Sequence, residues 1–227
     1  MTRTANARLA GFMFLFYIAV GILSMVLFSR ASGGTDPVAR LASIAAHDPL
    51  FRVTILLTLA QFVAAVVLGV TLYSLTRDED RDVALLALCC RLTEGILGAA
   101  AAVGSLELLK VALASVGTDG GAMAARNFGS VLLMRGGQTE VIAATCFAFG
   151  STLFSYLFLR ARSIPVSLAW LGVAASLLLV VVLPLRIAGI VHGTIIYYVW
   201  IPMAVFEIAL AFWLMIKGVR PPQSATI

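Results

Sequence analysis

Long apolar stretches alternate with short polar segments along the whole of this 227-residue chain. A helix that crosses a bilayer needs about 20 predominantly apolar residues. Six stretches come close to that length, at residues 9–28, 53–75, 83–106, 141–159, 164–185 and 194–216. Each is apolar on all sides, whereas a strand of a membrane β-barrel alternates apolar and polar residues. The pattern predicts an all-α integral membrane protein, a bundle of six transmembrane helices.

The composition agrees with this prediction. Hydrophobic residues make up 61% of the chain and charged residues 12%, against about 45–50% and about 25% in soluble domains. This balance excludes an ordinary soluble domain. The chain is also short enough for residues 1–227 to form a single polytopic membrane domain.

The connecting segments predict additional structure. Segment 29–52 predicts a short helix at Pro37–Ala46, and segment 116–140 predicts a separate short helix at Ala122–Met134 that ends before the glycine pair 136–137 and lies at the membrane interface.

The third apolar stretch remains helix-forming as far as Leu113, so we expect that helix to continue past the bilayer surface or to bend. Glu107 and Lys110, spaced i, i+3, are expected to form a pair on this extension. Gly95, Gly98 and Ala102 share one face of this helix and favour close packing against another helix, with the floor of a cavity beside the charges as the alternative.

Basic residues near helix ends indicate the orientation, because cytoplasmic connections carry the excess of Lys and Arg. One side collects eight of them: Arg3, Arg8, Arg77, Arg81, Arg160, Arg162, Lys217 and Arg220. The other side collects seven, mostly in the two long connections. We therefore predict a plasma (inner) membrane protein with both termini in the cytoplasm. The net charge of +5 then reflects helix anchoring, so we expect membrane lipid as the partner and no nucleic acid.

Cysteine and histidine give no strong signal for a cofactor. Cys89, Cys90 and Cys146 all lie within apolar stretches, where we expect small buried side chains without a disulfide. His47 and His192 lack a supporting carboxylate pattern, so they are a weak basis for a haem or metal site. We predict no metal and no cofactor.

Three charged residues stand inside the apolar stretches: Arg91 and Glu94 in the third, and Glu207 in the sixth. An ionisable group at bilayer depth is costly unless it is paired or hydrated. Counted from the cytoplasmic helix ends at ~1.5 Å per residue, Arg91 lies roughly 13 Å deep, Glu94 roughly 18 Å and Glu207 roughly 15 Å. These residues are the candidate functional site.

The similar depths predict a bidentate ion pair between Arg91 and Glu207, which would link the third and sixth helices. Such a pair is a structural clasp. The alternatives are a solute or proton site, because intramembrane charges often mark pathways, and a charge that faces a partner subunit. If Arg91 is committed to Glu207, Glu94 needs another edge of Arg91, a hydroxyl group or a proton, and Thr93 and Gln61 are candidate partners.

Several short motifs resemble a known bacterial membrane-protein family. They are Ala7-Arg8-Leu9-Ala10-Gly11, Phe51-Arg52, Cys90-Arg91-Leu92-Thr93-Glu94, Ser163-Ile164-Pro165, and Glu207 with Trp213-Leu214-Met215-Ile216-Lys217-Gly218. Together they resemble the family called domain of unknown function 4386, with Cys90 in place of its usual aromatic residue. The resemblance extends from about Ala7 to Gly218 and implies no known activity. It implies that Arg91, Glu94 and Glu207 belong to one feature of the fold, without saying whether that feature is structural.

Three functions from different classes remain open at this point. The first, which the sequence favours, is a non-enzymatic membrane component with a buried Arg/Glu cluster that packs against partners or lipid. The second is a small-solute or proton-coupled carrier that uses Glu94 or Glu207. The third is an enzyme that acts on a lipid or quinone, although the sequence contains no HExxH, GxSxG, CxxC or phosphate-binding glycine loop.

Overall fold

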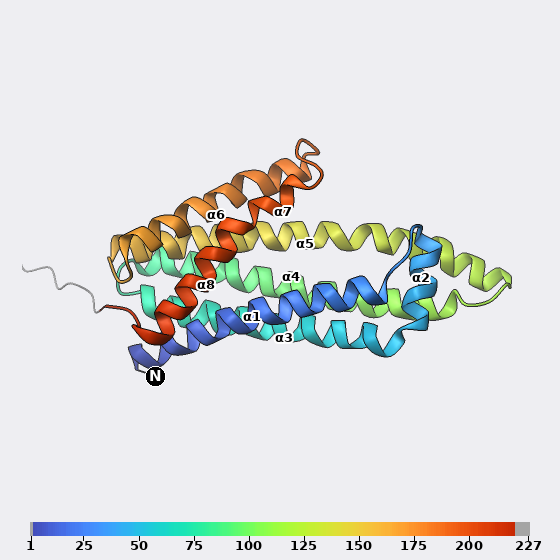
Figure 1. Ribbon diagram of the computed structural model, residues 1–227, viewed down its shortest axis with the longest axis horizontal. Helices are drawn as coiled ribbons and strands as arrows, with labels where there is room; N and C mark the ends of the chain where they lie inside the picture. Colours follow the sequence, from blue (N-terminus) through green and yellow to red (C-terminus); the bar gives the residue numbers. More distant parts are fainter. Residues whose placement is uncertain (1, 221–227) are drawn as a thin grey trace, which may run out of the picture. The chain divides into compact units, whose positions relative to one another are not determined.

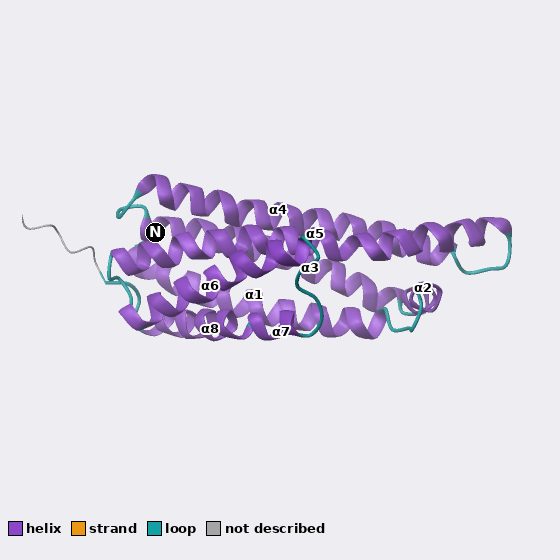
Figure 2. Ribbon diagram, turned by 90° about the horizontal axis from the view of Figure 1, so that it is seen from above, coloured by secondary structure: helices purple, strands orange, loops and turns teal. Residues whose placement is uncertain are grey.

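The computed structural model describes residues 2–220, apart from the side chains of residues 135–138, and this part of the chain is helical without strands. Figures 1 and 2 show the helices and their short connections. The helices are α1 (Arg3–Ala31), α2 (Pro37–Ala46), α3 (Asp48–Thr76), α4 (Arg81–Ala114), α5 (Gly120–Arg160), α6 (Val166–Ile187), α7 (Ile195–Val199) and α8 (Ile201–Ile216).

Six helical segments are long and apolar enough to cross a membrane, which confirms the predicted six-helix, all-α architecture. Five are α1, α3, α4, α5 and α6, and the sixth is Ile195–Ile216, which comprises α7 and α8. Helix α1 begins at Arg3, before the apolar stretch that predicted it. Hydropathy marks only the part of a helix suited to hydrocarbon, whereas the backbone hydrogen bonds continue into its polar ends.

The prediction of a separate helix at Ala122–Met134 is wrong, because these residues belong to the long helix α5. It runs without interruption for 41 residues and includes the glycine pair at 136–137. A glycine inside a helix costs only about 1 kcal/mol relative to alanine, which the long flanking helical segments tolerate.

Helix α4 continues to Ala114, as expected from its sequence. Glu107 and Lys110 are both exposed, and no ion pair joins them within the described residues, so the predicted pair is wrong. A Cβ atom added at Gly98 would meet nothing within 4 Å, so close packing is wrong there as well.

The short helix α2 has the bounds that the sequence predicts. The side chain of Asp36 accepts a hydrogen bond from the backbone amide of Ala39 at 2.9 Å, and Pro37 occupies the first turn. An aspartate cap followed by proline is a common helix start. The aspartate accepts a hydrogen bond from an amide that has no partner inside the helix, and proline has no amide hydrogen at the position where it would be unpaired.

The chain folds as two compact units, each built from several chain segments. Unit 1 comprises residues 1–17, 64–95 and 141–227, and unit 2 comprises residues 18–63 and 96–140. The core of unit 1 includes Phe14, Phe158 and Leu210, and the core of unit 2 includes Leu41 and Phe51.

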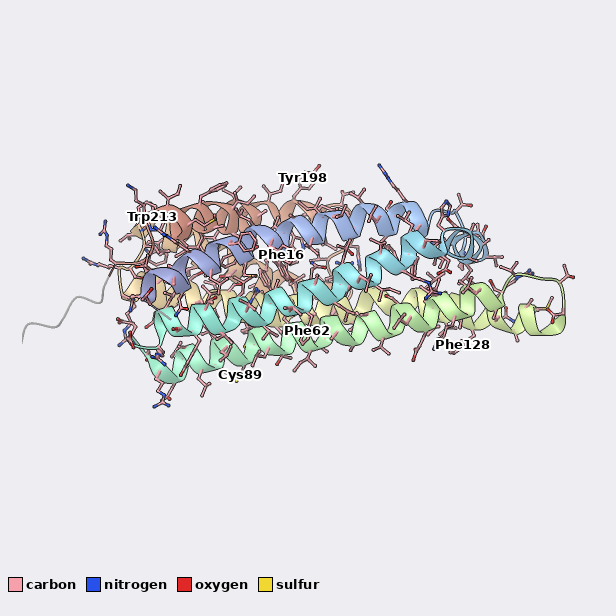
Figure 3. The ribbon with its side chains drawn as sticks, turned by 90° about the horizontal axis from the view of Figure 1, so that it is seen from below. Phe16, Phe62, Cys89, Phe128, Tyr198 and Trp213 are labelled. Carbon is pink, nitrogen blue, oxygen red and sulfur yellow. The ribbon has the colours of Figure 1, made fainter. Side chains whose placement is uncertain are left out.

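Side chains that face away from the cores are largely apolar, as lipid contact requires. Cys89 and Tyr198 lie on the outside of their helices (Figure 3), and Tyr198 is 67% exposed. The three cysteines are free thiols, and Cys89 is exposed and not buried as the sequence suggested.

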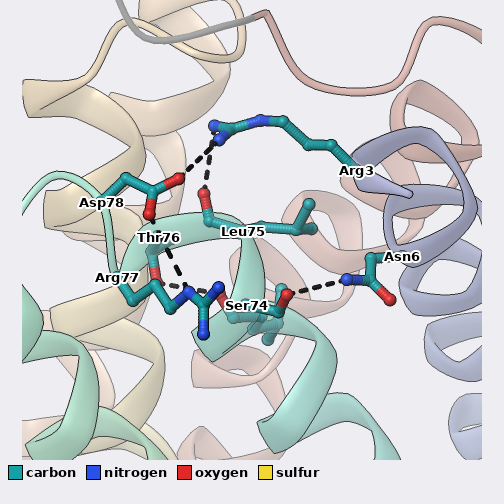
Figure 4. A network of polar contacts seen from close by, with 8 residues as sticks. Arg3, Asn6, Ser74, Leu75, Thr76, Arg77 and Asp78 are labelled. Atoms are coloured by element: carbon teal, nitrogen blue, oxygen red, sulfur yellow. Dashed lines mark hydrogen bonds and ion pairs between the residues drawn. The ribbon is translucent and has the colours of Figure 1, made fainter. Parts of the chain in front are cut away.

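Polar contacts tie the ends of the helices together in unit 1 (Figure 4). Arg3 Nη1 lies 3.2 Å from Asp78 Oδ2, and Arg3 Nη2 donates to the carbonyl of Leu75 at 3.2 Å. Asn6 Nδ2 donates to Ser74 Oγ at 2.7 Å. These contacts fix the start of α1 against the end of α3.

Glycine at position 11 brings α1 and α8 into close contact. A Cβ atom there would lie 2.5 Å from the carbonyl oxygen of Ala211 and 2.7 Å from Met215 Cγ. No side chain larger than hydrogen fits without moving the α8 backbone.

We predict that Gly11→Ala lowers the free energy of unfolding by about 1–3 kcal/mol, the usual effect of overpacking. Thermal unfolding in detergent micelles measures the change. Gly98→Ala is the matched control, since its new methyl group enters open space, and it should be neutral or slightly stabilising. Equal melting temperatures for the two variants would contradict the close contact of α1 with α8.

Candidate functional site

Arg91, Glu94 and Glu207 are all buried in unit 1. Arg91 is 1% exposed, and the two glutamates are each 6% exposed. Arg91 and Glu94 lie one turn apart on α4, and Arg91 Nη1 stands 2.9 Å from Glu94 Oε2. The two groups form an ion pair whose atoms are not aligned for a hydrogen bond. The charge of Arg91 is therefore balanced by a neighbour on its own helix.

Helix α1 contributes a residue that the sequence analysis missed. Tyr17 donates its hydroxyl to Glu94 Oε1 at 2.7 Å, so both oxygens of this carboxylate have a partner. The hydrogen-bond partner of Glu94 is thus Tyr17 and neither of the two expected candidates, Thr93, which donates to the carbonyl of Cys89, and Gln61. A signal was present, because a tyrosine inside an apolar stretch needs a partner for its hydroxyl.

Two aromatic rings lie close to the Arg91 guanidinium. Its Cζ is 5.7 Å from the ring centroid of Tyr17 and 4.9 Å from that of Phe147 on α5. A guanidinium this close to aromatic faces gains cation–π stabilisation, which is strongest where water is excluded. These contacts bring α1, α4 and α5 together around one positive charge.

Glu207 on α8 has a different environment. No ion pair or hydrogen bond engages its carboxylate within the described residues, and its Oε1 is fully buried without a partner. The predicted bidentate pair between Arg91 and Glu207 is therefore wrong. Glu207 still interacts electrostatically with both Arg91 and Glu94, so the three predicted residues form one cluster.

A narrow pocket connects Arg91 with Glu207. Its volume is about 10 Å³, which is room for about one water molecule. Ser151 and Ser155 of α5 contribute to its wall. The remaining lining residues are apolar: Phe14, Leu72, Phe154, Phe158, Phe206 and Leu210.

Glycine at position 172 of α6 shapes this pocket. A Cβ atom there would lie 2.6 Å from Ser155 Oγ and would also overlap the ring of Phe206. Phe206 precedes Glu207 on α8, so the packing of its ring against α6 helps to set where the Glu207 carboxylate lies.

The formal charges of the cluster do not cancel. Arg91 contributes +1, and Glu94 and Glu207 contribute −1 each when ionised, which gives 1 − 2 = −1. Glu94 lies against the cation and accepts from Tyr17, whereas Glu207 does neither. We call the paired part, Arg91 with Glu94 and Tyr17, the closed half of the cluster. The part around Glu207, which is unpaired among the described residues, is the open half.

The described residues contain no group of three or more His, Cys, Asp or Glu side chains placed to hold a metal ion. His47 lies with a ring nitrogen 2.9 Å from the carbonyl oxygen of Ser43 at the end of α2. His192 lies in the segment between α6 and α7.

Six apolar helices and a buried charged cluster define a multi-pass membrane protein with a polar site among its helices. The chain belongs to the family described as domain of unknown function 4386, whose family model matches residues 9–218. The match confirms the family that the sequence motifs resemble. No curated protein and no solved structure matches the chain.

We predict that Tyr17→Phe lowers the free energy of unfolding by about 1.5–3 kcal/mol, the range for a hydrogen bond to a charged group. Chemical unfolding in detergent measures the change. Tyr73→Phe, which removes a partly buried hydroxyl from α3 outside the cluster, is the control and should be nearly neutral. Two equal values would mean that the Tyr17 hydroxyl does not stabilise Glu94.

A double-mutant cycle separates the two carboxylates. Removing Arg91 alone leaves buried carboxylates without a cation and should cost about 3–5 kcal/mol, whereas removing a whole pair is milder. We therefore expect a larger coupling free energy between Arg91→Leu and Glu94→Leu than between Arg91→Leu and Glu207→Leu. Denaturation of the single and double variants gives both values, and the reverse order would contradict the assigned pairing.

Proposed function

We propose that this protein is a non-enzymatic membrane carrier for a small solute or protons, with the pocket between Arg91 and Glu207 as its binding site. One observation carries the proposal. Glu207 is a buried carboxylate that lines a pocket and has no partner among the described residues. A buried charge without a partner is strongly unfavourable, so a residue of this kind is expected where a ligand or proton compensates it.

The structural alternative explains only half of the cluster. A clasp between helices accounts well for Arg91, Glu94 and Tyr17, which link α4 to α1. It does not account for Glu207, since an apolar side chain of similar size would stabilise α8 at least as well. The carrier hypothesis accounts for both halves, because a binding site needs a rigid wall and a free group.

The orientation of the chain is part of the same proposal. The short connections after α3 and α5 carry Arg77 and Arg160–Arg162, which supports a cytoplasmic side for them. We accordingly propose a bacterial inner-membrane protein with cytoplasmic termini, surrounded by membrane lipid and without a nucleic-acid partner.

The carrier hypothesis is tested by measuring whether the pocket can be reached from each face of the membrane. In a background where Cys89, Cys90 and Cys146 are replaced by alanine, Ser151→Cys places one thiol on the pocket wall. A membrane-impermeant thiol reagent is then applied to right-side-out and to inside-out vesicles. A carrier exposes its site to each side in turn, so we expect labelling in both preparations.

Ser176→Cys is the matched control, because Ser176 is fully buried and bonded to the carbonyl of Gly172 within α6. It should stay unlabelled in both preparations. Absence of labelling at Ser151→Cys from both sides, in a protein that elutes as a folded species, would reject the carrier and leave the structural component.

A further inference from the structure

The open half of the cluster, around Glu207, defines what the pocket can bind. Glu207 lines the pocket together with Arg91 and the hydroxyl-bearing Ser151 and Ser155. Its Oε1 is shielded from solvent and lacks a hydrogen-bond donor within the described residues. The group therefore presents an acceptor, and no donor, to the space in front of it.

Among the described residues, the charged and titratable groups that interact with Glu207 come from two helices, α4 and α1. Helix α4 contributes Arg91 and Glu94, and helix α1 contributes Tyr17, which also interacts with Glu207. From α5, Cys146 acts on Glu94. The only charged residue of α6, Arg186, lies in its last turn. With Arg91 held by Glu94, one negative charge remains.

One additional positive charge makes the cluster neutral. A metal cation fits poorly, because it would share the pocket with the Arg91 guanidinium and like charges repel strongly where the dielectric constant is low. A proton meets the same need without a second cation centre. It forms an O–H bond on the carboxylate, and that O–H group can then donate to a neighbouring oxygen.

We propose that Glu207 binds and releases one proton inside the membrane, and that this proton is the coupling ion or the cargo of the protein. This inference rests on the carrier proposed above and names its ligand. The step is a simple transfer: Glu207 takes a proton from water on one side of the membrane and returns it to water on the other. No electron transfer or leaving group is involved.

The test combines a spectroscopic and a flux measurement on the full-length chain. Infrared difference spectra of the protein in lipid nanodiscs, recorded between two pH values, should show one carboxylic-acid carbonyl band that disappears in Glu207→Gln. Proteoliposomes with an enclosed pH dye should show proton uptake under an imposed membrane potential, and Glu207→Gln should abolish it.

Glu107→Gln is the control, because this glutamate is exposed on α4 and lies in unit 2. It should retain both the band and the flux. Glu207→Asp guards against a folding defect, since it keeps a carboxyl group and should shift the band without removing it. A band and a flux that persist unchanged in folded Glu207→Gln would overturn the proposal.

A sodium titration at fixed pH tests whether the ion that Glu207 binds is Na⁺ and not H⁺. If Na⁺ and not H⁺ removes the carboxyl signal or drives the flux, the proton assignment is wrong. Two-sided labelling of Ser151→Cys without any Glu207 signal would reject the proton and keep the carrier. Loss of that labelling would instead reject the carrier itself, so the two failures are distinguishable.

Discussion

The burial of a guanidinium group among apolar helices is the constraint on which this site depends. Arg91 is 1% exposed, and placing such a side chain at the centre of a membrane helix costs about 2.5–3.5 kcal/mol even by insertion scales. The surroundings offset this cost with an ion pair at 2.9 Å and two aromatic rings. Because these groups come from α1, α4 and α5, the compensation of one charge also fixes how three helices pack.

Two glutamates of equal burial have different environments in this arrangement. Glu94 has a cation at one oxygen and a hydroxyl donor at the other, so both of its oxygens have a partner. Glu207 has the field of the same cation but no contact with it. Two carboxylates of equal burial therefore differ in their bonding partners, which burial alone does not reveal.

The sequence was sufficient for the six-helix architecture, and it singled out three charged residues as candidates. Hydropathy found the six segments, and the rule that intramembrane charges are exceptional selected Arg91, Glu94 and Glu207. Depth along the helices could not reveal the pairing, because it says nothing about which side chains face each other. The sequence did contain a signal for Tyr17, whose hydroxyl needs a partner inside an apolar stretch. Nothing in the sequence marks Phe147, since aromatic residues are common in such stretches. Helix α5 continues through its glycine pair because the long helical segments on both sides offset the low helix propensity of glycine. The local sequence around the pair does not reveal this, since helix formation is cooperative over the whole length of the helix.

The choice of Glu94 over Glu207 as the partner of Arg91 has a physical cause. A pair at i, i+3 on one helix is brought together by the helix itself, so it loses little further freedom when it forms. A pair between α4 and α8 needs both helices to be placed correctly, and the α8 backbone is already fixed by Gly11 against Ala211 and by Phe206 against Gly172. These two contacts limit how far the α8 backbone can shift toward α4. An ion pair between Arg91 and Glu207 would therefore have to form around a backbone that is already positioned, whereas the pair on α4 forms within a single helix.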